Sequence, residues 1–172
     1  MQTNITLFCF LNNYSKNIAK ILADKLEMFY VDFAELLEYE LVDSGNIITA
    51  LGKRDGNKYI SGIEQKLIKT VNEYENTIIT INPVKLFSAK NSAAFKKSSF
   101  LVYLQVAPNI MANKAEETGD KTEPELIGAG FSERDKLYVT NSDIVIDCTK
   151  LKEKKAVKLL IKELKNLFKS RA

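Results

Sequence analysis

Five short apolar runs, separated by segments of helical periodicity, constrain the fold of this chain more than any other feature. The runs are residues 5–10, 28–32, 77–81, 100–106 and 143–147. Continuous apolar runs of this length are typical of strands that are covered on both faces. Helices between such strands imply parallel βαβ units with right-handed crossovers. The sequence therefore predicts a three-layer α/β/α domain around a five-stranded parallel sheet.

The segments between the strands repeat apolar side chains every three or four residues, which predicts helices that each bury one face. Such segments follow the first strand and also cover residues 34–41, 63–74 and 152–170. Ser15 is the expected cap of the first of these helices. Residues 42–58 contain three glycines and are predicted to be irregular or to form a short helix.

Length and composition indicate a single domain. The chain has 172 residues, of which 45% are hydrophobic, and one domain over residues 1–172 fits both values. No apolar run approaches the length of a membrane span, and the N-terminus lacks the pattern of a signal peptide. The formal charge of +3 implies no polyanionic partner, and the lysines of the last helix are expected to form a solvated outer face. We therefore expect a cytoplasmic monomer that binds neither membrane nor nucleic acid.

The sequence contains no histidine, and this narrows the chemistry available to the chain. It excludes Ser-His and Cys-His nucleophile pairs, most zinc sites and acid–base catalysis by imidazole. Carboxylates, lysine, arginine or a bound metal ion remain as candidate catalytic groups. The two cysteines, Cys9 and Cys148, lie in apolar strand-like runs and are expected to be buried free thiols.

The turn after the first strand, FLNNYSKN, raises the question of phosphate binding. A strand, a turn and a helix in this order often hold a nucleotide phosphate. Glycine is usual in such turns because its backbone lets phosphate approach closely. This turn contains Asn12, Asn13 and Tyr14 and no glycine. It could be a decayed phosphate loop, a loop rebuilt in another way, or an ordinary connection.

Several segments, in their order and spacing, resemble those of the shikimate kinase family over nearly the whole chain. They are LFCFLNNYSKNIAKILADKLEMFYVDFAELLEYEL, TIITINPV, FLVYLQVAPNIM, ERDKLY and DIVID. The resemblance implies a phosphate-loop kinase fold with strand order 2-3-1-4-5. It also implies the family reaction, in which ATP with Mg²⁺ phosphorylates the 3-hydroxyl of shikimate in aromatic amino-acid biosynthesis.

The same resemblance places a degenerate phosphate loop in the first turn. In the family's register, Cys9 and Tyr14 stand at the two motif glycines, and Asn12 stands at the glycine between them. Ser15 stands at the motif lysine, and Lys16 at the hydroxyl that binds Mg²⁺. The nucleotide-binding candidates are Asn12, Asn13, Tyr14, Ser15, Lys16 and Asn17. We expect the Tyr14 side chain to narrow the phosphate space and Lys16 to point along the helix toward solvent.

The positions that would bind metal and substrate are mostly altered as well. Asp32 keeps a family aspartate, as the catalytic candidate that would hold Mg²⁺ through water. Arg134 keeps the arginine expected near the substrate carboxylate. The family's second aspartate, helix arginine and glycine triplet have Ala34, Ser61 and the segment around Pro83 as counterparts, so these are vestigial substrate positions.

Residues 113–130 are polar and contain glycine, and they are predicted to form a lid-like loop. Within this loop, Glu123 stands where the family has an arginine that attracts ATP phosphates. The segment FSERDKLY after the lid is predicted to be a short helix. It should turn Arg134 toward the cleft beyond the carboxyl ends of the strands.

Three functional hypotheses follow from these positions. The first is a shikimate-kinase-like protein that is catalytically impaired and serves as a binding or regulatory module for a small molecule or a protein partner. The second is an active, divergent shikimate kinase, in which Lys16 and Asp32 carry the phosphate and metal roles. Asn17 would then have to serve as the Mg²⁺ ligand in place of the motif hydroxyl. The third is a kinase for another small molecule, because Ala34 and Ser61 would remove shikimate contacts without forbidding ATP. We favour the first, and ATP and Mg²⁺ are cofactors only in the other two.

Overall fold

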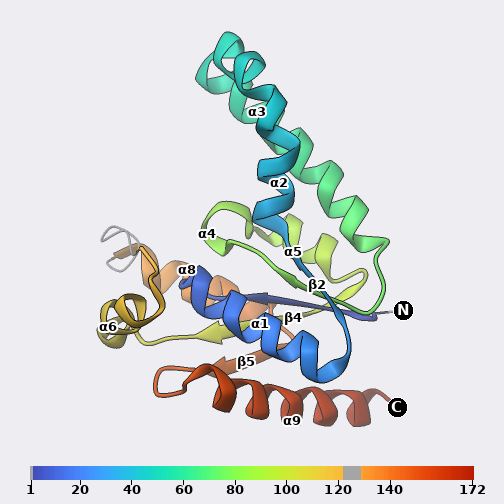
Figure 1. The fold of residues 1–172 in the computed structure, drawn as a ribbon, viewed down its shortest axis with the longest axis vertical. Coiled ribbons are helices and arrows are strands. Elements are labelled where there is room, and N and C mark those ends of the chain that lie inside the picture. The colour runs from blue at the N-terminus through green and yellow to red at the C-terminus, as the bar shows by residue number, and fades with distance from the viewer. Residues whose placement is uncertain (1, 122–128) are drawn as a thin grey trace.

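The computed structural model describes residues 2–121 and 129–172, and its centre is a five-stranded parallel sheet in the order β2-β3-β1-β4-β5. The strands are β1 Asn4–Phe8, β2 Phe29–Asp32, β3 Thr77–Thr80, β4 Ser99–Gln105 and β5 Ile144–Asp147. Helices lie on both sides of this sheet (Figure 1). The predicted three-layer fold and strand order are confirmed. The strand ends differ from the predicted ones by only one or two residues.

The helices alternate with the strands along the chain. They are α1 Asn12–Leu26, α2 Phe33–Leu41, the 3-10 helix η1 Val42–Ser44, α3 Gly45–Asn72, α4 Pro83–Leu86, α5 Ala89–Phe95, α6 Pro108–Thr118, α8 Ala129–Asn141 and α9 Glu153–Arg171. The expectation of an irregular stretch or short helix over residues 42–58 is confirmed in part. α3 consists of a short helical part, residues 45–51, and a longer one, residues 53–72, with non-helical backbone at Gly52 between them. Gly52 has a φ of 76°, which glycine adopts at little cost. Together α2 and α3 extend away from the sheet (Figure 1).

The core consists of two apolar clusters, one on each face of the sheet. Neighbouring residues of a strand point to opposite faces. Leu7 and Ile78 therefore lie in the cluster covered by α1 and α9, whereas Phe8 and Ile79 lie in the cluster covered by α3, α5 and α8. Burial on both faces explains why the central strands β1, β3 and β4 appear in the sequence as continuous apolar runs, whereas the edge strands β2 and β5 are partly exposed.

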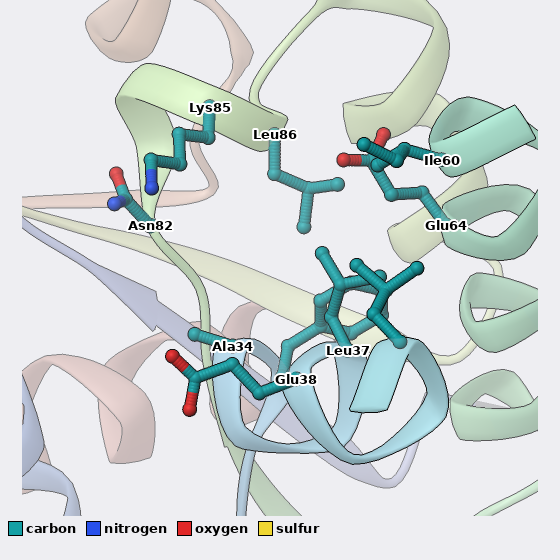
Figure 2. Close-up of a pocket in the computed structure, with 10 residues that line it drawn as sticks. Ala34, Leu37, Glu38, Ile60, Glu64, Asn82, Lys85 and Leu86 are labelled. Carbon is teal, nitrogen blue, oxygen red and sulfur yellow. The ribbon is translucent and has the colours of Figure 1, made fainter. Parts of the chain in front are cut away.

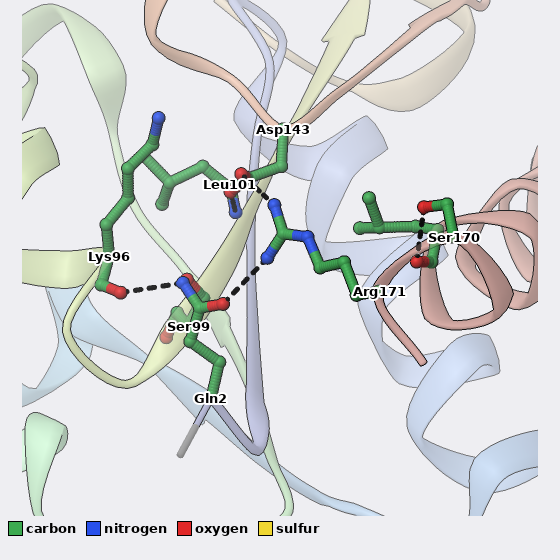
Figure 3. A network of polar contacts seen from close by, with 8 residues as sticks. Gln2, Lys96, Ser99, Leu101, Asp143, Ser170 and Arg171 are labelled. Atoms are coloured by element: carbon green, nitrogen blue, oxygen red, sulfur yellow. Dashed lines mark hydrogen bonds and ion pairs between the residues drawn. The ribbon is translucent and has the colours of Figure 1, made fainter.

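A polar network connects the C-terminal end of α9 to the amino end of the sheet (Figure 3). Arg171 of α9 donates to Gln2 Oε1 at 2.9 Å and pairs with Asp143 Oδ1 at 3.1 Å. Asp143 in turn accepts a hydrogen bond from Leu101 N in β4 at 2.8 Å. Exposed pairs of this kind contribute at most about 1 kcal/mol each, so they fix position more than they add stability.

The chain contains two cysteines, and both are free and buried, as predicted. Cys9 follows β1 and Cys148 follows β5, and β4 lies between these two strands. Burial raises the pKa of the Cys148 thiol to about 11 and raises the pKa of Cys9 far above its ordinary range. In the described part of the chain, no helix is both long and apolar enough to cross a membrane.

The thiols should therefore resist alkylation in the native protein. Iodoacetamide at about pH 8 reacts with thiolate, and neither buried thiol is ionised at that pH. We expect mass spectrometry to find no added label on the native chain and two labels after denaturation, one for each cysteine. Rapid labelling of Cys9 in the native protein would show that the turn after β1 opens to solvent.

Candidate functional site

The turn between β1 and α1 lies where a nucleotide phosphate would be expected, but it is short. β1 ends at Phe8 and α1 begins at Asn12, so residues 12–14 form the first turn of the helix. The first helical hydrogen bond runs from Ser15 N to Leu11 O at 3.1 Å. In the register of the phosphate-loop motif, the loop would extend to Tyr14. The first strand and the first helix are connected by a turn, as predicted. The second half of the predicted loop, residues 12–14, is helical.

The N-terminus of α1 holds a carboxylate from a distant part of the chain. Leu11 precedes the helix and offers no side chain to cap it. Instead Asn13 N donates to Asp120 Oδ1 at 2.7 Å, and Tyr14 N donates to Asp120 Oδ2 at 3.3 Å. Free N–H groups and the helix dipole make such a terminus an anion-binding site. The protein fills this site with its own side chain.

The end of α6 positions this carboxylate. Gly119 has a φ of 71° and ends the helix, and Asp120 N donates back to Ala115 O at 2.9 Å. The Thr118 hydroxyl donates to Asp120 Oδ2 at 2.6 Å, and Asn13 Nδ2 donates to Thr118 O at 3.2 Å. A glycine such as Gly119 is a sequence signal for the end of a helix. The contact between Asp120 and α1 has no such signal, because it joins residues 107 positions apart.

Tyr14 does not narrow the phosphate space, which corrects the expectation from sequence. Its side chain is 1% exposed and lies in the core cluster with Ile18 and Leu22, one and two turns further along α1. The hydroxyl donates to Leu151 O at 2.7 Å, and the Lys114 ammonium lies 4.5 Å from the ring centroid. Burial raises the pKa of the Tyr14 hydroxyl. Because α1 starts early, position 14 belongs to its buried face.

Ser15, at the motif lysine, is buried and contributes no positive charge. Its hydroxyl donates to Asn12 O at 2.9 Å within the helix. The expectation that Ser15 caps the helix is wrong, because the cap residue is Leu11. Asn17 is exposed on α1, whereas Asn12 lines a small pocket of about 60 Å³ with Lys16.

Lys16 also differs from its prediction, because it points into the site and not to solvent. Its Nζ forms an ion pair with Asp32 Oδ2 at 2.7 Å. Contact with this carboxylate raises the pKa of Lys16. The Asp32 side chain is only 2% exposed, and its other oxygen accepts from Ala34 N at 3.0 Å and so caps α2. Both oxygens of the candidate metal ligand therefore have partners in the protein.

A larger pocket of about 330 Å³ lies next to this pair, between α2, α3 and α4 (Figure 2). Its lining residues are Phe33, Ala34, Leu37, Glu38, Leu41, Ile60, Glu64, Asn82, Lys85 and Leu86. No three His, Cys, Asp or Glu side chains gather in the described residues as a metal site would require. The pocket is largely apolar, and it is placed to bind a small organic molecule.

The three positions that the resemblance marks as altered substrate contacts, Ala34, Ser61 and Pro83, lie at different distances from this pocket. Ala34 is part of its wall, whereas Ser61 is exposed on α3, and Ile60 and Glu64 face the pocket instead. Pro83 is the first residue of α4, where a missing N–H costs little. None of these three positions places an arginine in the pocket. Arginine is the residue type best suited to bind a carboxylate ligand.

Arg134 lies in α8, so the predicted helix after the lid is confirmed. It is half-buried, and its Nη1 atom is buried without a hydrogen-bond partner among the described residues. Burial raises the pKa of Tyr138 to about 12, and the charge of Arg134 opposes that rise. Arg134 is not among the residues that line the 330 Å³ pocket, so its role toward a substrate stays a prediction. Glu123 and most of the predicted lid's second half lie outside the described residues, whereas α6 forms the lid's first part.

Comparison with known proteins agrees with this fold. The family model for shikimate kinase matches residues 16–165. A shikimate kinase of Sulfurihydrogenibium sp. (strain YO3AOP1) is 27% identical over 139 residues, which cover 78% of this chain and 82% of that protein. A shikimate kinase of Thermodesulfovibrio yellowstonii is 23% identical over 170 residues, which cover 95% of this chain and 96% of that protein.

Solved structures are similar over nearly the full chain. The shikimate kinase from Bacteroides thetaiotaomicron has a TM-score of 0.72 at 18% identity, with 95% of this chain and 98% of that chain covered. The Acinetobacter baumannii enzyme in complex with shikimate has a TM-score of 0.69 at 13% identity, with 96% and 94% covered. Since the family model spans residues 16–165 of the 172, the chain belongs to the shikimate kinase family.

Proposed function

We propose that this protein is a catalytically impaired member of its family that binds a small molecule in the 330 Å³ pocket without transferring phosphate to it. The observation that carries the proposal is the Asp120 carboxylate at the N-terminus of α1. A phosphate and a carboxylate compete for the same N–H groups there. Asp120 also repels a phosphate that approaches the site.

Phosphoryl transfer depends on positioning and charge, with backbone N–H groups, a lysine and Mg²⁺ around the phosphates. In this protein the N–H groups and the metal-binding aspartate have other partners, and a serine stands at the position of the lysine. The N–H groups of Asn13 and Tyr14 bind Asp120, and Ser15 stands where the lysine would be. Asp32, which would hold the metal, is paired with Lys16.

A second candidate function is a kinase that uses Lys16 and Asp32, for shikimate or for another small molecule. The observation in its favour is that Lys16 points into the small pocket beside Asn12 and Asp32. In this alternative, a nucleotide with Mg²⁺ would separate the ion pair, so that Lys16 binds phosphate and Asp32 binds the metal through water.

Isothermal titration with Mg-ATP tests the proposal. We expect the unmodified protein to show no saturable binding at millimolar nucleotide. The Asp120→Ala variant should show saturable binding in the same concentration range, because a like charge leaves the anion site. Asp24→Ala, at an exposed position near the other end of α1, serves as the control and should behave like the unmodified protein.

Two results would contradict the proposal. One is tight binding of Mg-ATP by the unmodified protein that Lys16→Ala abolishes. The other is steady production of ADP with shikimate or another acceptor. The first would show a nucleotide site that uses Lys16, and the second would show phosphoryl transfer, so both together would establish the second candidate function. Thermal unfolding of each variant should accompany the titration, since loss of a helix cap costs about 1 kcal/mol of stability.

A further inference from the structure

The 330 Å³ pocket has apolar walls and an acidic character, and these properties define the ligand it can hold. Six of its ten lining residues are apolar, and Phe33, Leu37 and Leu86 are among them. Walls of this kind bind hydrocarbon and offer few partners for a ligand with many hydroxyls. The charged groups are the carboxylates of Glu38 and Glu64 and the ammonium of Lys85.

Glu64 differs from the other charged groups in its surroundings. Glu38 and Lys85 are exposed at the rim, whereas Glu64 is half-buried on α3, one turn after Ile60. Figure 2 shows its carboxylate beside Ile60 on the wall of the pocket. The carboxylate has no ion pair or hydrogen bond within the described chain, and desolvation raises its pKa. A carboxylate in apolar surroundings without a partner is costly, and a cation placed beside it would offset that cost.

We infer that the pocket binds a small primary amine, whose ammonium pairs with Glu64 and whose apolar body lies between α2 and α4. This rests on the proposed function, in which the pocket binds a small molecule. The second carboxylate, Glu38, adds negative potential at the rim, and Lys85 offsets only part of it. An organic anion would instead meet two carboxylates and one exposed ammonium, with no arginine in the lining.

Three ligands with the same phenyl body and different end groups test this inference. They are 2-phenylethylamine, 2-phenylethanol and 3-phenylpropionate, titrated into the full chain and followed by ¹H–¹⁵N NMR shifts. The amine should bind about tenfold more tightly than the alcohol, because its ammonium adds the attraction of opposite charges to the hydrogen bond with the Glu64 carboxylate. The carboxylate should bind most weakly. Shifts should map to α2, α3 and α4.

The Glu64→Gln variant removes the negative charge of this side chain and keeps nearly the same shape, so it tests the contribution of the charge alone. It should remove the preference for amine over alcohol and leave binding of the alcohol unchanged. Glu73→Gln, exposed just after the end of α3, is the matched control and should keep the preference. Tighter binding of the carboxylate or of shikimate would overturn the inference, and so would a preference for amine that persists in Glu64→Gln. None of these results depends on Mg-ATP, so nucleotide turnover would refute the proposed function separately.

Discussion

Replacing Tyr14 by alanine is expected to lower the free energy of unfolding by about 3–5 kcal/mol, the usual cost of truncating a buried aromatic side chain. The ring is 1% exposed and contacts the core cluster that joins α1 to α9 and the sheet. Its removal leaves a cavity that the surrounding helices can fill only in part. It also removes the ring beneath the Lys114 ammonium. Urea denaturation followed by circular dichroism measures the loss.

Tyr14→Phe is the matched control for this experiment, because it keeps the ring and removes only the hydroxyl. Leu151 O would still accept from Lys114 Nζ at 2.8 Å, so the cost should be about 1 kcal/mol. An alanine variant as stable as the phenylalanine variant would place the ring outside the core. It would then support the earlier expectation that Tyr14 narrows the phosphate space.

Replacing Lys16 by methionine should cost about 3 kcal/mol, at the lower end of the range for a broken buried ion pair. The Asp32 side chain is 2% exposed and would lose its partner at Oδ2. The Lys16 side chain is 29% exposed, so part of its favourable interaction is already screened by water. Urea denaturation at neutral pH measures the effect.

A double-mutant cycle identifies the cause of that loss. Adding Asp32→Asn to Lys16→Met should recover most of the stability, because the buried charge is gone and the asparagine oxygen can still accept from Ala34 N. Lys20→Met, one turn further along α1 and exposed, should change stability by less than about 0.5 kcal/mol. Equal effects at positions 16 and 20 would mean that the ion pair does not form in solution.

The sheet could be predicted from sequence because its three central strands, β1, β3 and β4, are buried on both faces and therefore stand out as continuous apolar runs. The early start of the second part of α3 could not, because Gly52 and Gly56 both indicate helix breaks and only Gly52 is one. Gly56 has a different reason to be glycine: a Cβ there would lie 3.1 Å from Ile48 O. It allows the two parts of α3 on either side of Gly52 to approach closely, and such an approach has no signature in local sequence.

The site was predicted in part. The turn after β1 and the positions around Asp32 and Ala34 lie where the motif register placed them. The directions of Tyr14 and Lys16 were wrong because that register assumed a loop up to position 14. Once helix begins at Asn12, position 14 falls on the buried face and Lys16 reaches Asp32. Asp120 could not be predicted, because its partners on α1 are set by tertiary packing.

The early start of α1 limits which single substitutions the protein can tolerate at positions 14 and 15. Glycine at position 14 would restore a motif residue, but it would first open a void in the core. Lysine at position 15 would place a charge where a buried serine now sits. Each single substitution toward the phosphate-loop motif would thus be penalised before the turn could hold a nucleotide. A nucleotide-binding loop at this position would therefore require several residues to change together.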